Sequence, residues 1–234
     1  GSATRLVREA DRAVVAVDRV WRDGDESTDW PRRPVLLVPA DQRGMATLLG
    51  YDGSGLGQIA AVTTGEFQDG LSRGDRVVLN PEAFGTLGAT GRAVVLTHEM
   101  THVAVRASTV VTPPAWLSEG FADYVAYRAN PVPVSVVAGD VIAQVRRGRL
   151  PRELPDQADF DTETANLASS YEQSWLACRL IAARYGAQTL VRLYRAMTDS
   201  AGPGWPEESQ PVLGITADQF TRQWRAYLQE VAAS

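Results

Sequence analysis

The sequence contains no lysine, and all 23 of its basic residues are arginine. A phosphate-binding P-loop depends on a lysine, so we do not expect the glycine-dense stretch 50–57 to bind a nucleotide and predict a hairpin turn there instead. The 28 acidic residues give a net charge of −5, which argues against a nucleic-acid partner. The single cysteine excludes an intramolecular disulfide.

Long hydrophobic runs are also missing. No window approaches the roughly eighteen apolar residues of a transmembrane helix, so we predict no membrane span. Hydrophobic residues still make up 44% of the 234 residues, enough to form the core of one large or two small domains. Gly1-Ser2 resembles a cloning remnant, and we expect the natural N-terminal segment to be missing.

Histidine is scarce as well, and its placement is informative. The only two histidines, His98 and His102, lie four positions apart, with Glu99 directly after the first. On a helix, residues at this spacing share one face about 5–6 Å apart, so both imidazoles can bind one cation. The flanking sequence is apolar and free of proline, which favours a buried helix with Thr90 as its N-cap. This pattern is typical of zinc hydrolases, in which the glutamate handles the proton of a zinc-activated water.

A catalytic zinc usually takes three protein ligands, and the sequence has no third histidine. The third ligand is then a carboxylate or a thiol. Cys178 is the only thiol, but it lies in an apolar stretch, and a buried lone cysteine usually packs as a small apolar residue. Glu119 is the better candidate. It lies seventeen positions after His102, enough for a turn at Pro113-Pro114 and a second helix beside the first.

Taken with the histidine motif, the segment Leu117-Ser118-Glu119-Gly120-Phe121-Ala122-Asp123 resembles the gluzincins, the zinc peptidases that include thermolysin and the zinc aminopeptidases. The resemblance covers about residues 76–185 and is weak over the first seventy. It implies one zinc ion per chain, bound by His98, His102 and Glu119.

The same resemblance implies roles for residues around the metal. Asp123 would accept the free ring N–H of His98 and fix its tautomer. A tyrosine after the zinc ligands would donate a hydrogen bond to the oxyanion; Tyr171 is the first choice, with Tyr124 and Tyr127 as alternatives.

The resemblance also implies the fold: an α+β, zincin-like class, with a small mixed sheet packed on the zinc helix and a mostly helical C-terminal lobe across an active-site cleft. Proline-framed and β-branched runs predict strands at 34–39, 58–64 and 76–80. Asp41 and Thr216 are predicted helix caps. The other predicted helices span 4–21, 114–128, 134–147, 171–185 and 188–198. We expect an N-terminal α/β region spanning residues 1–130 and a helical lobe spanning residues 131–234 that together form one catalytic unit.

Gluzincins bind extended peptides along an edge strand beside the metal helix, and either 58–64 or 76–80 could serve. In the zinc aminopeptidases, the glutamate of a Gly-x-Met-Glu-Asn motif binds the free amino terminus of the substrate. This motif is absent from residues 79–85, so the resemblance does not imply aminopeptidase activity. The function implied is a zinc metallopeptidase with Glu99 as general base and a peptide or protein as substrate. The alternatives are an inactive zinc-binding module, a zinc amidase with a non-peptide substrate, and a metal-free structural domain. We expect an extracytoplasmic location, because such peptidases are often exported.

Overall fold

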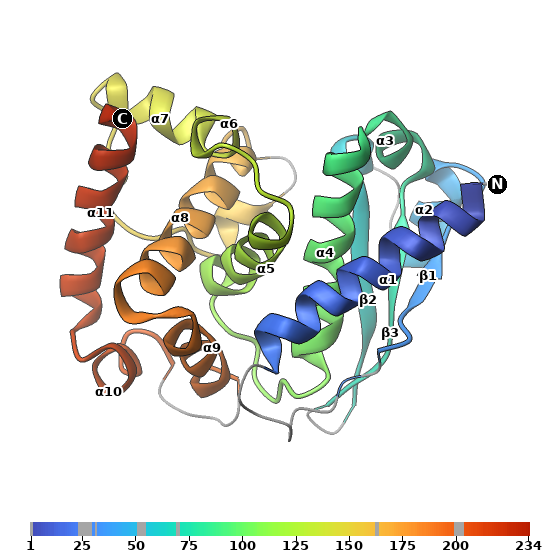
Figure 1. Ribbon diagram of the computed structural model, residues 1–234, viewed down its shortest axis with the longest axis horizontal. Coiled ribbons are helices and arrows are strands. Elements are labelled where there is room, and N and C mark those ends of the chain that lie inside the picture. The colour runs from blue at the N-terminus through green and yellow to red at the C-terminus, as the bar shows by residue number, and fades with distance from the viewer. Residues whose placement is uncertain are drawn as a thin grey trace. The chain divides into compact units, whose positions relative to one another are not determined.

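The computed structural model describes residues 2–22, 30, 32–50, 55–68, 71–161, 164–198 and 204–234 (Figure 1). The protein is α+β, as predicted, with helices predominating and a small mixed sheet. It divides into two compact units. Unit 1 comprises residues 1–109 and 125–130, and unit 2 comprises residues 110–124 and 131–234. None of the described helices combines the length and apolar character needed to cross a bilayer.

Unit 1 contains the sheet and the helix that carries both histidines. Its elements are α1 (Ser2–Trp21), β1 (Val35–Leu37), α2 (Gln42–Leu49), η1 (Leu56–Gln58), β2 (Ala61–Gln68), β3 (Leu71–Leu79), α3 (Pro81–Thr86) and α4 (Ala89–Arg106). The strand order is β1-β3-β2, with β1 parallel and β2 antiparallel to β3. Within the described sheet, β3 is therefore the central strand and β2 an edge strand.

Helix α4 is held on two sides within unit 1. It packs on β2 and β3, and α1 packs along it (Figure 1). The apolar residues Leu96, Met100 and Val103 recur at helical spacing and are almost completely buried. They form the apolar face by which α4 packs into the core. A partly buried ion pair between Arg92 and Glu9, 3.1 Å apart, ties the first turn of α4 to α1.

The β2–β3 hairpin is tied to the other end of α4. A bulge interrupts the β2–β3 register between Thr64 and Glu66. Gly65 sits in this bulge, where a Cβ would lie only 3.0 Å from the Cγ of Asp75, so a larger residue does not fit. Arg106 Nε donates to the Asp75 carboxylate at 3.1 Å, and Ser72 Oγ donates to the same oxygen at 2.7 Å. This network fixes β2 and β3 against the last turn of α4.

Unit 2 contains helices, joined by loops, and no strand among its described residues. Its elements are α6 (Val134–Val137), α7 (Gly139–Arg146), η2 (Ala158–Phe160), α8 (Leu167–Tyr185), α9 (Ala187–Ala196), α10 (Ser209–Leu213) and α11 (Ala217–Ala233). Helix α8 packs against α7, α9 and α11. Helix α5 (Ala115–Ala129) is shared, since residues 115–124 belong to unit 2 and the remainder to unit 1.

Two predicted helix starts are confirmed. Asp41 caps α2 by accepting from the Gly44 N–H at 2.8 Å. Thr216 caps α11 in a capping box with Gln219. Both signals are local, which explains why the sequence reveals them.

Other boundaries were predicted wrongly. The N-cap of α4 is Gly88, so Thr90 lies inside the first turn. The helix predicted over 134–147 consists of the two helices α6 and α7. Helix α8 begins four residues earlier than predicted, at Leu167, so Tyr171 is not at its start.

The strand predictions also need correction. β2 begins at Ala61 rather than residue 58, and β3 extends back to Leu71. The predicted turn over 50–57 does not join β1 to β2, because β2 pairs with β3 and η1 intervenes. Within that turn, residues 51–54 lie outside the described residues. The strand predicted at 76–80 ends at Leu79, because Asn80 caps α3 and Pro81 occupies the first turn of that helix.

Candidate metal centre

The two histidines of α4 direct the same ring atom at each other. The Nε2 atoms of His98 and His102 are 3.0 Å apart, and the rings meet edge to face at a centroid distance of 4.8 Å. Both residues are partly buried. Either one ring donates a proton to the other, or both lone pairs face a shared cation.

This spacing fits a zinc ion. With Zn–N distances of about 2.0–2.1 Å and tetrahedral angles, two ligand nitrogens of one zinc are separated by roughly 3.3 Å. The observed 3.0 Å separation is close to that value. Imidazole nitrogen is also a donor that zinc commonly takes.

Glu119 supplies a third donor near the histidine pair. One ligand atom from each of His98, His102 and Glu119 lies within 4.8 Å of the others. A carboxylate with two imidazoles is the donor set of one class of catalytic zinc sites. The largest separation exceeds the bound spacing by at most about 1.5 Å, a distance that a change of side-chain rotamer can close.

The alternative ligand Cys178 does not belong to this group. Its side chain is fully buried in α8. Burial raises the pKa of the Cys178 thiol well above its usual range, and the nearby charge of Asp123 raises it further. A thiol that resists deprotonation is a poor metal ligand, because zinc binds the thiolate. Of the two ligand types left open by the sequence, the structure favours the carboxylate.

Two contacts position α5, the helix that carries Glu119. At its C-terminal end, Asn130 Nδ2 donates to Thr97 Oγ1 on α4 at 3.3 Å. Near its start, Gly120 packs against α8, and a Cβ there would lie 2.6 Å from the carbonyl carbon of Ser174. The residue directly after the predicted ligand is therefore a glycine because α8 leaves no room for a side chain.

Glu99 faces the sheet. Its side chain is 7% exposed, and its Oε2 accepts a hydrogen bond of 2.6 Å from Thr63 Oγ1 on β2. The same hydroxyl lies 3.1 Å from the backbone oxygen of Glu99. Thr63 was missed by sequence reasoning, because nothing in the sequence relates a threonine of one strand to a glutamate thirty-six residues later.

Asp123 and Tyr171, the two other predicted site residues, lie on α5 and α8. Asp123 lies one turn beyond Glu119 on α5 and is partly buried. Tyr171 lies in the second turn of α8, where its ring meets Phe160 edge to face at 5.2 Å. Neither belongs to the group formed by the three predicted ligands. The proposed bond from His98 to Asp123 and the oxyanion contact of Tyr171 stay predictions.

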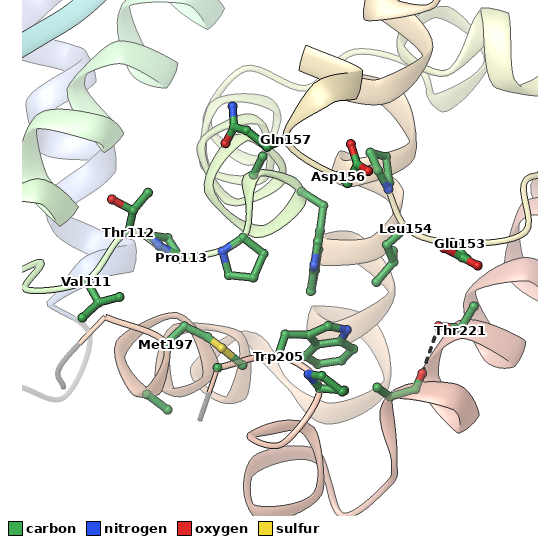
Figure 2. A pocket seen from close by; sticks show the side chains of 18 of the residues that line it. Val111, Thr112, Pro113, Glu153, Leu154, Asp156, Gln157, Met197, Trp205 and Thr221 are labelled. Carbon is green, nitrogen blue, oxygen red and sulfur yellow. Dashed lines mark hydrogen bonds between the residues drawn. The ribbon is translucent and has the colours of Figure 1, made fainter. Parts of the chain in front are cut away.

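A separate pocket of about 750 Å³ lies in unit 2 (Figure 2). Trp205 and Met197 line it together with Trp116, whose ring meets that of Trp205 edge to face at 5.2 Å. Trp116 Nε1 is buried and has no hydrogen-bond partner among the described residues. None of the six predicted site residues lines this pocket.

Comparison with known proteins adds no relative. No protein-family model, no curated protein and no solved structure matches the chain.

Proposed function

We propose that this protein is a zinc-dependent metallopeptidase of the gluzincin type. The observation that carries the proposal is the 3.0 Å approach of the His98 and His102 Nε2 atoms on a helix that also bears Glu99. The position of the Glu119 carboxylate, within 4.8 Å of both histidine ligand atoms, supports it further.

His98, His102 and Glu119 would hold one zinc ion. Bound there, zinc would act as a Lewis acid and lower the pKa of a water molecule to about 7. The Glu99 carboxylate takes a proton from the attacking water and later delivers it to the leaving nitrogen of the peptide. Asp123 is the proposed partner of the His98 ring N–H, and Tyr171 the proposed donor to the oxyanion.

The sheet suggests where an extended substrate binds. β3 has a neighbour on each side, so its main chain is already paired, whereas β2 has a neighbour on one side only in the described sheet. A peptide that pairs with the free edge of β2 would lie beside α4, on which β2 packs. We therefore propose β2, of the two strands that the sequence left open, as the substrate strand.

A zinc amidase acting on another carbonyl compound would use the same residues, since zinc and a base do not select the substrate. An inactive zinc-binding module is favoured less, because a site without chemistry has no need of a base beside the first histidine. Peptide-cleavage assays separate the peptidase from the other two functions.

The test is metal content combined with cleavage of a mixed peptide library that includes peptides blocked at either end. We expect about one zinc per wild-type chain. Glu119→Ala should weaken zinc binding by at least the roughly 10–100-fold that loss of an outer-sphere partner causes. Glu99→Gln should retain zinc and lose about 10²–10⁴-fold in rate. Glu230→Ala, which removes an exposed carboxylate from α11, is the matched control and should behave as wild type.

The outcomes discriminate among the proposals. Zinc binding without cleavage of any peptide would refute the peptidase and favour the amidase or the binding module. A wild-type protein without zinc, unaffected by Glu119→Ala, would refute the metal centre itself.

A further inference from the structure

We propose that Thr63 is a positioning residue that holds the Glu99 carboxylate in the orientation needed for proton transfer. The inference rests on the proposed function and adds to it a residue outside the zinc-binding motif. Its basis is the 2.6 Å hydrogen bond that Thr63 Oγ1 donates to Glu99 Oε2. Among the described residues, Thr63 is the only side chain that donates a hydrogen bond to this carboxylate.

The Thr63 hydroxyl is itself held rigidly. Threonine is branched at Cβ, so few χ1 rotamers are open to it on a strand. Its backbone is in register with Val77 of the central strand β3. The Asp75–Arg106 pair joins the same hairpin to the end of α4, with Nε and Oδ1 3.1 Å apart. Both partners of the hydrogen bond therefore belong to one fixed assembly of α4, β2 and β3.

The hydrogen bond from Thr63 makes the two carboxylate oxygens of Glu99 inequivalent. Oε2 accepts from Thr63, and the rotation of the carboxyl group is thereby restricted. Oε1 is then the oxygen that accepts the proton. A general base must lie within about 2.6–3.2 Å of the proton it removes, so a freely rotating Glu99 would satisfy this condition only some of the time.

This role predicts a particular kinetic signature. Thr63 does not belong to the predicted metal ligands, so its loss should leave zinc binding intact. Substrate pairing with a strand uses main-chain groups, so KM should also change little. The loss should fall on kcat and be about 10–100-fold, the range typical when a residue supporting a catalytic group is removed.

The experiment compares three variants with wild type. Thr63→Val keeps the shape and removes the hydroxyl, and Thr63→Ser keeps the hydroxyl. Thr47→Val, the control, makes the same threonine-to-valine change at an exposed position of α2, away from the proposed site. For each we would measure zinc content, kcat and KM on a peptide that the wild type cleaves. The readout independent of activity is the side-chain carboxyl ¹³C resonance of Glu99, assigned through Glu99→Gln and recorded on metal-free and zinc-loaded protein.

We expect Thr63→Val to lower kcat about 10–100-fold while its zinc content and KM stay within about twofold of wild type. Thr63→Ser should restore most of kcat, Thr47→Val should match wild type, and the Glu99 resonance should shift in Thr63→Val alone. If Thr63→Val does not fold, as judged by circular dichroism, Thr63→Ala replaces it.

Failure of this inference can be distinguished from failure of the proposed function. An active wild type whose kcat and Glu99 resonance do not change in Thr63→Val would overturn the role of Thr63 and leave the peptidase proposal standing. A wild type that binds no zinc or cleaves no peptide would overturn the proposed function, and the role of Thr63 with it.

Discussion

Gly120→Ala should destabilise the protein, although alanine is the better helix former. The added Cβ would lie 2.6 Å from the carbonyl carbon of Ser174 and 2.9 Å from Sγ of Cys178. Unstrained carbon contacts are about 3.5–4.0 Å, so α5 and α8 must separate by roughly 1 Å at this point. The closest atoms belong to the backbone of α8 and cannot rotate away.

The magnitude follows from two opposing effects. Overpacking of this kind costs about 1–3 kcal/mol and sometimes more, while replacing glycine by alanine in a helix recovers about 1 kcal/mol. Because the clash involves backbone, we expect the upper end of the range and a net loss of about 2 kcal/mol in the free energy of unfolding. For a chain of this length, that corresponds to a Tm lower by about 4–8 °C.

Thermal and urea denaturation, followed by circular dichroism, would measure this loss. The control is Gly85→Ala in α3, where an added Cβ meets no atom within 4 Å. We expect that variant to be unchanged or stabilised by up to about 1 kcal/mol. A Gly120→Ala protein as stable as Gly85→Ala would show that the close approach of α5 and α8 is not a real constraint.

Two further substitutions test the polar contacts of buried or half-buried carboxylates. Asp75→Ala removes a carboxylate that is only 8% exposed and that accepts hydrogen bonds from both Arg106 and Ser72. We expect the free energy of unfolding of the metal-free protein, measured by urea denaturation, to fall by roughly 2–4 kcal/mol, and a loss below about 0.5 kcal/mol would contradict the assigned role of this carboxylate. Glu172 accepts hydrogen bonds from the Val141 and Asp140 N–H groups at the start of α7, and burial raises its pKa above the usual 4.5, with the like charge of Asp140 a minor cause. The Glu172 carboxyl therefore keeps its proton to higher pH in the folded state than in the unfolded state. As pH rises from about 4.5 through the raised pKa, the contribution of Glu172 to the free energy of unfolding falls. Glu172→Gln should remove that contribution to the pH dependence. The free energy of unfolding, measured by urea titration, should therefore rise in the variant relative to wild type as pH rises over this interval. A difference that stays constant with pH would show that the pKa of Glu172 is not raised.

The elements predicted best are those with short-range signals. Asp41 and Thr216 accept hydrogen bonds from backbone N–H groups three residues ahead, so the cap and its partner lie within one stretch of sequence. The i, i+4 spacing of His98 and His102 is likewise a property of one helix, and α4 brings their Nε2 atoms within 3.0 Å. The short helices α3 and η2 were not predicted, because they are too short to show a helical periodicity of apolar residues.

The sequence by itself determined the mixture of helices and strands and the helix that carries the two histidines, because periodicity and helical spacing act over a few residues. The candidate ligand Glu119 came from the resemblance to the gluzincins. Only the tertiary structure decided that β2 rather than β3 is the edge strand, that Thr63 donates to Glu99, and that Gly120 packs against the backbone of α8. Each of these depends on which distant segments pack together. That choice is made by the burial of whole faces of helices and strands, and neither partner of such a contact carries a local signal for the other.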